Sequence, residues 1–516
     1  MAIPKHGQGG GGLVNSLAAQ RILRAESSFL CLLILGHSRV KTIVEIWKKG
    51  GVIMPIDLDR ILSLKEKPWP PFLYDLQGNI IKGNGRDHTV NIFFRFGPDR
   101  DRIISWLRYF SKKYITSAAQ QFREIELYNQ NGLPGGLFGG LYLSAEGYRA
   151  LGVPSAKVPP DPSFLAGMKH TIPDLYDPPP ETWDTGFAGE IDGMVLLADD
   201  DPSYLYRQAQ IVIGQIARIG EVVQIEKGDV LRNNRGEGIE HFGYADGRSQ
   251  PIMILEDLQR EEFDLDGISV WNPAAFLSLA LVPDPAGYPD TALGSYYVFR
   301  KLEQNVRLFK HTEQELGIAL GYIGDEVERG GGQVVGRFED GTPLVNQKEP
   351  GVESPVPNNF NYADDPFGFK CPFRSHIRKV NPRTEEAKKN RIVRRGIPYG
   401  EVSPTQKDLP ALPTKDVGLL FACFQANIGN QFEYMQAALA NNESAPKNPL
   451  DFKPGKDPVI GQGPATVEQQ WRGPWGGQAT PDNTKNFPTV FPFSQSVTLK
   501  GGEYFFAPSL SGLRNL

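Results

Sequence analysis

Three stretches of the sequence hold side chains that could do chemistry, and an aspartate between glycines lies in the first of them. In HFGYADGRSQP (241–251), Asp246 stands one residue before Gly247 and three after Gly243. The pattern is typical of a turn, and equally of a carboxylate that a glycine backbone aims at a ligand. A carboxylate so placed can accept a proton and return it. His241, directly before the motif, then keeps a supporting or structural role.

A histidine among basic residues marks the second stretch, KCPFRSHIRKVNPR (370–383). A neutral imidazole can ligate a metal while nearby cations bind the carboxylates or phosphates of an anionic cofactor. The alternative is a basic surface loop, which composition alone favours. The histidine is His376, and the basic residues around it are Arg374, Arg378, Lys379 and Arg383.

The third stretch, NRIVRRGIPYG (390–400), reads as a strand. Alternate residues of a strand face the core, so Arg394 could point inward. A buried arginine is unfavourable unless it meets an anion. The alternative is an edge strand that leaves Arg394 and Arg395 in solvent.

Composition and missing motifs exclude several classes of protein. The net charge of −5 gives no basic face for nucleic acid, and no apolar run reaches the roughly 18 residues of a membrane span. Three cysteines are too few for a disulfide framework. The chain contains no HExxH, CxxCH, GxSxG or GxxxxGK[ST] motif, which argues against a zinc protease, covalent haem, a serine hydrolase and a phosphate-binding loop.

The elements that must position these residues follow one pattern twice. The first half predicts strands at 88–97, 135–144, 189–200 and 221–231, with helices at 99–115 and 202–220. The second half predicts strands at 294–302, 418–428 and 497–509, with helices at 303–321 and 429–441. Each half resembles the β-α-β-β-α-β, ferredoxin-like arrangement. We therefore expect an α+β fold of two such domains.

Long loops interrupt both halves, at 157–184, 323–415 and 443–495. Insertions of that length more often carry or cover a site than act as linkers. We place the domains at 56–270, which carries the GxxDG motif, and 271–516, which carries His376. Residues 1–55 have no clear status: FLCLLIL (29–35) is compatible with a leader or a buried helix.

The ordered set of motifs resembles the dye-decolourising (DyP-type) haem peroxidases, most closely their fungal members. The motifs are GYADG, GSYYVFRKLEQ, CPFRSHIRK-x-NPR, IVRRGIPYG and LLFACFQ, and DLQGNIIKGNGRDH (75–88) resembles the start of that family. The match runs from about residue 56 to the C-terminus. GxxDG alone is weak, but the ordered set is specific.

The resemblance implies a role for each matched position. His376 would be the proximal ligand of a haem b iron, with one non-covalent haem per chain held in the C-terminal half. Asp246 would be the distal acid–base residue, Arg394 the arginine beside it, and Leu419 and Phe421 would line the distal pocket. Gly243 and Gly247 would let backbone and acid approach the haem. Two weaker inferences are Arg378 as a partner of a haem propionate and Glu433 as acceptor of the second N–H of His376.

The resemblance further implies a peroxidase that reduces H2O2 to water through a ferryl iron and a porphyrin radical. Its reductants would be dyes, phenolics and, among the open choices, lignin fragments or Mn²⁺, with activity shifted to acidic pH. Fungal members often carry a relay tryptophan that FEYMQAALANN (432–442) lacks. Surface electron relays would then be found among Tyr434, Trp471 and Trp475, for each of which core packing is the alternative.

Two other functions compete with this reading. One is a haem carrier or sensor on the same fold, which needs His376 but neither Asp246 nor Arg394. The other is a ferredoxin-like interaction protein with no cofactor. Family resemblance favours a secreted enzyme, and a cytoplasmic one is the alternative because no clear cleavage site follows the apolar run.

Overall fold

The computed structural model describes residues 56–351, 355–401, 408–449, 451–471, 475 and 489–516. The expectations for residues 1–55 therefore lie outside the described residues. Residues Asp57–Leu516 form one compact unit, in which the two predicted halves share a single sheet. No helix in these ranges is long and apolar enough to cross a membrane.

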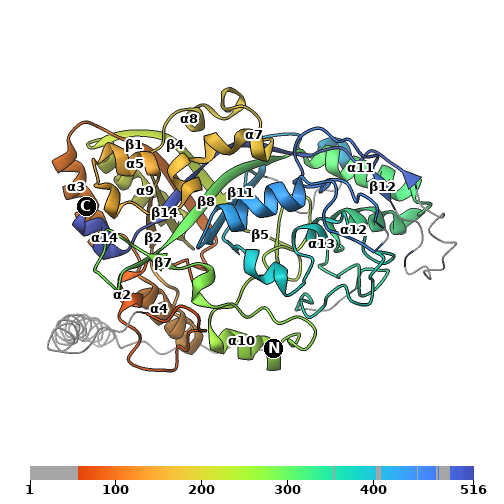
Figure 1. Ribbon diagram of the computed structural model, residues 1–516, viewed down its shortest axis with the longest axis horizontal. Helices are drawn as coiled ribbons and strands as arrows, with labels where there is room; N and C mark the ends of the chain where they lie inside the picture. Colours follow the sequence, from red (N-terminus) through yellow and green to blue (C-terminus); the bar gives the residue numbers. More distant parts are fainter. Residues whose placement is uncertain (1–55, 352–354, 402–407, 450, 472–474, 476–488) are drawn as a thin grey trace, which may run out of the picture. The chain divides into compact units, whose positions relative to one another are not determined.

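A ten-stranded antiparallel sheet runs through the whole unit (Figure 1). Its main path has the order β10-β11-β8-β14-β2-β3-β1-β4, and two short strands, β7 (Val282–Pro283) and β9 (Val393–Arg394), pair beside it. The main strands are β1 (His88–Phe96), β2 (Phe138–Leu143), β3 (Gly193–Asp199), β4 (Gly220–Asp229), β8 (Leu293–Gln304), β10 (Ile397–Tyr399), β11 (Gly418–Gln425) and β14 (Val497–Ala507).

The N-terminal half has the strand order β2-β3-β1-β4, which is the ferredoxin-like order. Helices α3 (Arg100–Lys113) and α9 (Pro202–Ile216) form where the apolar periodicity predicts them. A further helix, α4 (Ala118–Asn131), was not predicted. Its signals are local: the Ser117 hydroxyl accepts from the Gln120 N–H at the start, and Gly132 closes the end at φ 66°.

The C-terminal half repeats the arrangement with the order β10-β11-β8-β14. Its helices are α11 (Val306–Ala319) and η8 (Gly429–Ala440), and η8 is wound as a π-helix. The two halves meet where Phe506 of β14 pairs with Leu143 of β2. The prediction of an α+β fold with two ferredoxin-like halves is thus confirmed.

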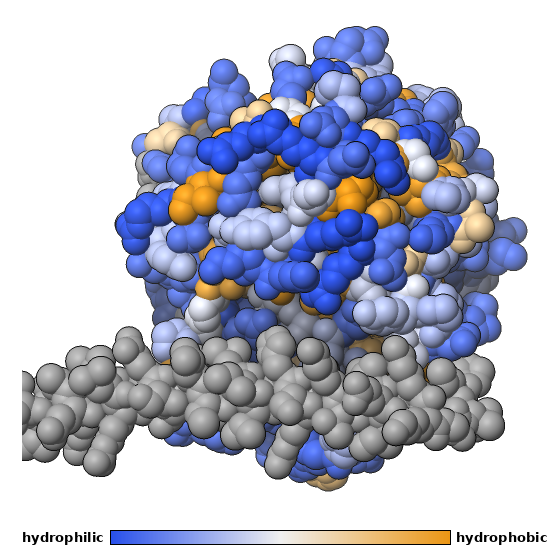
Figure 2. Space-filling model, turned by 90° about the vertical axis from the view of Figure 1, so that its left-hand side faces the viewer, coloured by the Kyte–Doolittle hydropathy of each residue, from blue (hydrophilic) through white to orange (hydrophobic). Residues whose placement is uncertain are grey.

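The core lies between the sheet and its covering helices. Phe93 of β1 packs on Phe299 of β8 with ring centroids 4.7 Å apart, and on Phe187 at 5.0 Å. On the molecular face at the left of Figure 1, hydrophilic side chains predominate and apolar ones gather only in small groups (Figure 2). Because Phe93 belongs to the N-terminal half and Phe299 to the C-terminal half, the burial of apolar side chains holds the two halves together along the shared sheet.

The long insertions hold short helices rather than plain loop. The insertion 323–415 contains α12 (Arg329–Val335) and α13 (His376–Val380). Helix α13 packs against α12 and against η8. This packing brings the histidine of the basic stretch to the end strands of the sheet.

Candidate haem-binding active site

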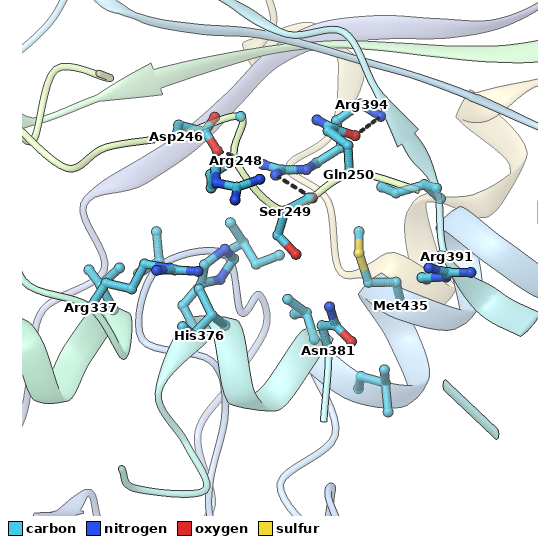
Figure 3. A pocket seen from close by; sticks show the side chains of 18 of the residues that line it. Asp246, Arg248, Ser249, Gln250, Arg337, His376, Asn381, Arg391, Arg394 and Met435 are labelled. Atoms are coloured by element: carbon cyan, nitrogen blue, oxygen red, sulfur yellow. Dashed lines mark hydrogen bonds and ion pairs between the residues drawn. The ribbon is translucent and has the colours of Figure 1, made fainter. Parts of the chain in front are cut away.

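A cavity of about 360 Å³ lies among the elements that carry the three chemical stretches. Its walls come from the loop after β6 (Gly238–Ile239), from β9, from β11, from α13 and from η8. Asp246 and Arg394 lie on one side of the cavity, and His376 lies on the other (Figure 3). The fold therefore brings together the acid, the arginine and the histidine that the sequence singled out.

The loop that carries Asp246 depends on its glycines. Gly243 has φ 97° and Gly247 has φ 81°, both in the left-handed region that residues with a Cβ rarely adopt. Gly247 lines the cavity, whereas Gly243 lies against the Glu339 side chain outside it. The backbone of Asp246 is fixed by a hydrogen bond from its N–H to the Gly238 carbonyl, 3.0 Å.

Arg394 and Asp246 form an ion pair inside the cavity. Arg394 Nη1 donates to Asp246 Oδ1 over 2.6 Å, and Nη2 donates to the Ser249 carbonyl over 3.1 Å. Burial raises the pKa of Asp246, but the Arg394 charge and hydrogen bond outweigh it, and the pKa falls below its usual value. Asp246 is therefore ionised, and able to accept a proton, even in mildly acidic solution.

Across the cavity, His376 is held by a carboxylate that the sequence analysis missed. His376 Nδ1 lies 2.9 Å from Asp457 Oδ2, and Asp457 Oδ1 accepts the N–H groups of Val459 and Ile460. Burial disfavours a cationic ring, but the Asp457 charge outweighs it and raises the pKa of His376. With its Nδ1 proton donated to Asp457, His376 offers Nε2 as a lone-pair donor to a metal.

Glu433 was predicted to accept the proton of His376, and this is wrong. Its Oε2 accepts from the Ser163 hydroxyl over 2.8 Å, and Glu433 does not line the cavity. Asp457 takes the role from the loop 443–495, 81 residues beyond the histidine. No local pattern connects the two, since only the folding of that loop brings them into contact.

Two buried arginines line the cavity without a carboxylate partner among the described residues. Arg337 donates to the Gly341 and Pro357 carbonyls at 2.6 and 2.8 Å, and its Nη2 has no partner. Arg383 donates to the Asn358 and Phe360 carbonyls. Burial, with mutual repulsion, lowers the pKa of Arg337 to about 9, and burial lowers that of Arg383 to about 10. Uncompensated buried cations beside a cavity fit a bound dianion.

Arg378, the predicted propionate partner, does not line the cavity. Its guanidinium donates to the Asp365 carboxylate over 2.7 Å and stacks 4.2 Å from the Phe373 ring. The prediction rested on nearness in sequence to His376, but on α13 a residue two positions away points to another face. Arg337 and Arg383 stand where an anionic group could reach them.

The remaining wall of the cavity is apolar. Leu419 and Phe421 project into it from β11, as the family resemblance implied, and Met435 and Leu439 do so from η8. A flat apolar group with a polar, anionic edge would match this combination of walls. The two cysteines in the described ranges, Cys371 and Cys423, are buried, and neither lines the cavity.

The three candidate relay residues differ sharply in position. Trp471 is fully buried and donates to the Phe491 carbonyl, so it belongs to the core and cannot be a surface relay. Trp475 is partly buried, donates to the Leu344 carbonyl and does not line the cavity. Tyr434 alone combines an exposed side chain (40 %) with a place in the cavity wall.

His241 has the structural place expected of it. It is buried, does not line the cavity, and its Nε2 lies 2.7 Å from the Tyr399 carbonyl. Burial lowers its pKa. The ring joins the Asp246 loop to β10.

Comparison with known proteins finds a family profile and several proteins that this chain resembles. A family profile described as "Dyp-type peroxidase, C-terminal" matches residues 329–453, which include α12, α13 and β11. The multifunctional dye peroxidase DyP2 of Amycolatopsis is 43 % identical over 90 % of this chain and 100 % of its own length. The dye-decolorizing peroxidase msp1 of Mycetinis scorodonius is 29 % identical over 86 % of this chain and 87 % of its own.

Solved structures agree with the sequence relatives. The Amycolatopsis DyP2 structure matches with a TM-score of 0.83 at 42 % identity, covering 89 % of this chain and 100 % of its own. A DyP-type peroxidase of Anabaena matches with a TM-score of 0.80 at 39 % identity, covering 86 % and 94 %. The expectation that fungal members are the most similar is not supported, because these bacterial proteins exceed the fungal msp1 in identity.

Proposed function

The chain belongs to the DyP-type peroxidases, haem enzymes that oxidise dyes, and from this premise we propose how its cavity residues act. The observation that carries the proposal is the Asp246–Arg394 pair facing His376 across one cavity (Figure 3). A haem-storing protein needs only the histidine. The distal ion pair supplies what a reaction with hydrogen peroxide requires.

The residues of the cavity fit a haem. His376, oriented by Asp457, would ligate the iron through Nε2. Arg337 and Arg383 would meet the two propionates, which would satisfy the unpartnered Nη2 of Arg337. We propose one haem b per chain, bound without a covalent link. When bound, the haem would supply the redox centre that gives two electrons to peroxide and regains them from reductants one at a time.

Asp246 would be the proton shuttle. As a carboxylate it accepts the proton of one peroxide oxygen, and as a carboxylic acid it delivers that proton to the other oxygen as the O–O bond breaks and water leaves. Arg394 would place its guanidinium cation beside the departing oxygen and stabilise the negative charge that develops there. The pKa of Asp246 is below the usual value, which predicts activity that extends into acidic solution.

Reductants would give their electrons at two places. Small phenols would be oxidised within the cavity, whereas bulky dyes would be oxidised from the protein surface. Tyr434, exposed and in the cavity wall, would relay electrons from dyes held at the surface. Its position on η8 gives it contact with both environments.

A haem reconstitution tests the proposal directly. The purified chain should gain a Soret band on addition of haem, change its spectrum within the mixing time on addition of H2O2, and decolourise a dye at acidic pH. Haem binding without a response to peroxide would instead favour a carrier or sensor. Absence of a Soret band would favour a protein without cofactor, and either result would refute the peroxidase mechanism.

A further inference from the structure

The surroundings of His376 opposite the distal pair carry more positive than negative charge. Arg374 is buried, its Nε and Nη1 have no hydrogen-bond partner, and it forms no ion pair with any described residue. Its guanidinium lies 4.9 Å from the centre of the Trp471 ring, which holds a cation without neutralising it.

Lys379 is the second buried cation. Its side chain is inaccessible to solvent, and Nζ donates to the carbonyls of Asn442, at 2.9 Å, and Ala445. Both acceptors are uncharged, and within the described ranges no carboxylate lies within ion-pair distance of Nζ. When protonated, a buried lysine that is bonded only to carbonyls places an unneutralised positive charge in a region of low dielectric constant.

The carboxylate that acts most strongly on both cations is Asp457, which is fully buried and already bonded to His376. Burial lowers the pKa of Lys379 to about 8 and of Arg374 to about 10, and in both cases the Asp457 charge is the first effect to raise it. Glu443 acts on both more weakly and is bonded to Thr466. Two cations therefore share one buried carboxylate, so one positive charge is in excess.

We propose that Arg374 and Lys379 are positioning residues that raise the reduction potential of the haem iron and so extend the reductants to compounds that are hard to oxidise, such as non-phenolic aromatic ethers. This inference rests on the proposed function of the same site. The Arg394–Asp246 pair across the cavity adds no net charge, because the two groups pair one to one.

Two effects act in the same direction. Fixed positive charge in a desolvated region favours the iron state with the lower charge. The cations also stabilise the Asp457 charge, so that Asp457 draws the Nδ1 proton of His376 less strongly and the ring becomes a weaker donor to the oxidised iron. Because both effects favour reduction, removing either cation should lower the potential.

The experiment is a redox titration of the haem-loaded full chain, followed by its visible spectrum at pH 6, where Lys379 is protonated. Lys379→Met and Arg374→Met keep the length of the side chain and remove its charge. Each should lower the midpoint potential of the ferric/ferrous couple, and the double variant should lower it further. Lys379→Arg should restore it. The control is Lys67→Met, which removes one charge from an exposed ion pair with Glu126 and should leave the potential unchanged.

A vibrational readout separates charge from loosened packing. Resonance Raman spectra of the ferrous protein should show the iron–histidine stretch shifting to higher frequency in Lys379→Met, because Asp457 then pulls harder on the His376 proton. A shift to lower frequency would indicate a loosened ligand and would refute the inference. The ratio of non-phenolic to phenolic oxidation rates should fall in the same variants.

Failure of the inference is distinguishable from failure of the proposed function. If the wild-type chain binds no haem, the proposed function fails. If haem binds and responds to peroxide but both Met variants keep the wild-type potential, the inference alone is overturned. Should one of them not accumulate as folded protein, Lys379→Gln or Arg374→Gln takes its place under the same criterion.

Discussion

Arg394 donates to Asp246 over 2.6 Å although 148 residues separate them in sequence. The contact exists because β9, which carries the arginine, pairs with β11 beside the glycine-rich loop that carries the acid. Arg394 is anchored independently of Asp246, through the Ser249 carbonyl and through its own N–H to Gln250 Oε1. Each member of the pair can therefore be replaced without displacing the other.

Replacing the acid tests its role as proton shuttle. Asp246→Asn keeps the shape and removes the base, so the reaction with H2O2 should slow by about 10²–10⁴-fold. Stopped-flow spectra of the haem-loaded protein measure this rate. Haem content should stay at the wild-type level, whereas His376→Ala should lose haem. An unchanged rate in Asp246→Asn would assign proton transfer to another group.

Replacing the arginine tests the pH dependence. Arg394 lowers the pKa of Asp246, and only the ionised acid can accept a proton. Without the guanidinium this pKa rises, so the acid becomes protonated at a higher pH. The acidic limb of the rate profile in Arg394→Met should therefore move to higher pH, besides the loss of rate at the optimum. A limb that stays in place would show that Asp246 does not control it.

The Glu240 carboxyl, which binds backbone N–H groups of the Asp246 loop, predicts a change of stability with pH. Glu240 accepts the Phe242 and Tyr244 N–H groups, at 2.8 and 3.1 Å, and its burial raises its pKa from 4.5 to about 7. Because the pKa of Glu240 is higher in the folded than in the unfolded chain, its contribution to stability is complete below the unfolded pKa of 4.5. The free energy of unfolding should then fall by about 3 kcal/mol as the pH rises through 7.

Glu240→Gln removes that titration and one acceptor oxygen. The variant should be less stable than wild type at pH 5 and relatively more stable at pH 9, so the difference between their urea midpoints should change sign or shrink with pH. Midpoints measured at both values on the haem-free chain check this. A difference independent of pH would contradict the buried, titrating carboxyl.

Replacing Arg337 should weaken haem binding without destabilising the haem-free chain. Arg337→Met removes a buried cation without a carboxylate partner, so haem affinity should fall while the haem-free chain becomes no less stable. Arg378→Met is the matched control, because it strands Asp365 and should destabilise the haem-free chain by about 3–5 kcal/mol. Haem titrations and urea unfolding separate the two outcomes. Equal haem affinity in Arg337→Met and wild type would contradict a propionate at this position.

If Tyr434 relays electrons, its replacement should slow the oxidation of bulky dyes but not of small phenols. Tyr434→Phe removes only the hydroxyl and with it the site's capacity to form a tyrosyl radical, so the oxidation of a bulky dye should fall. A small phenol that enters the cavity should be oxidised at the wild-type rate. Steady-state rates with both reductants measure the split, and Trp475→Phe serves as the control because it lies outside the cavity wall. Parallel loss on both substrates would contradict a surface relay.

The sequence by itself determined the periodic elements and the three reactive residues. Strand and helix patterns in both halves predicted the ferredoxin-like arrangement, because the apolar period of each element is local. Asp246, Arg394 and His376 each have an ordinary alternative when taken alone: a turn, an edge strand and a basic surface loop. The ordered motifs then connected them.

Only the tertiary structure decided the partners of those residues. Nearness in sequence to His376 suggested Arg378 for the propionate, and Glu433 was the expected acceptor for the histidine. Both were wrong, because side-chain direction on a helix and the course of a long loop decide contact. Asp457 reaches His376, and Arg337 reaches the cavity, through the insertions 323–415 and 443–495. Such loops lack a period, so their path, and the charge they bury beside the haem ligand, follow only from the packed fold.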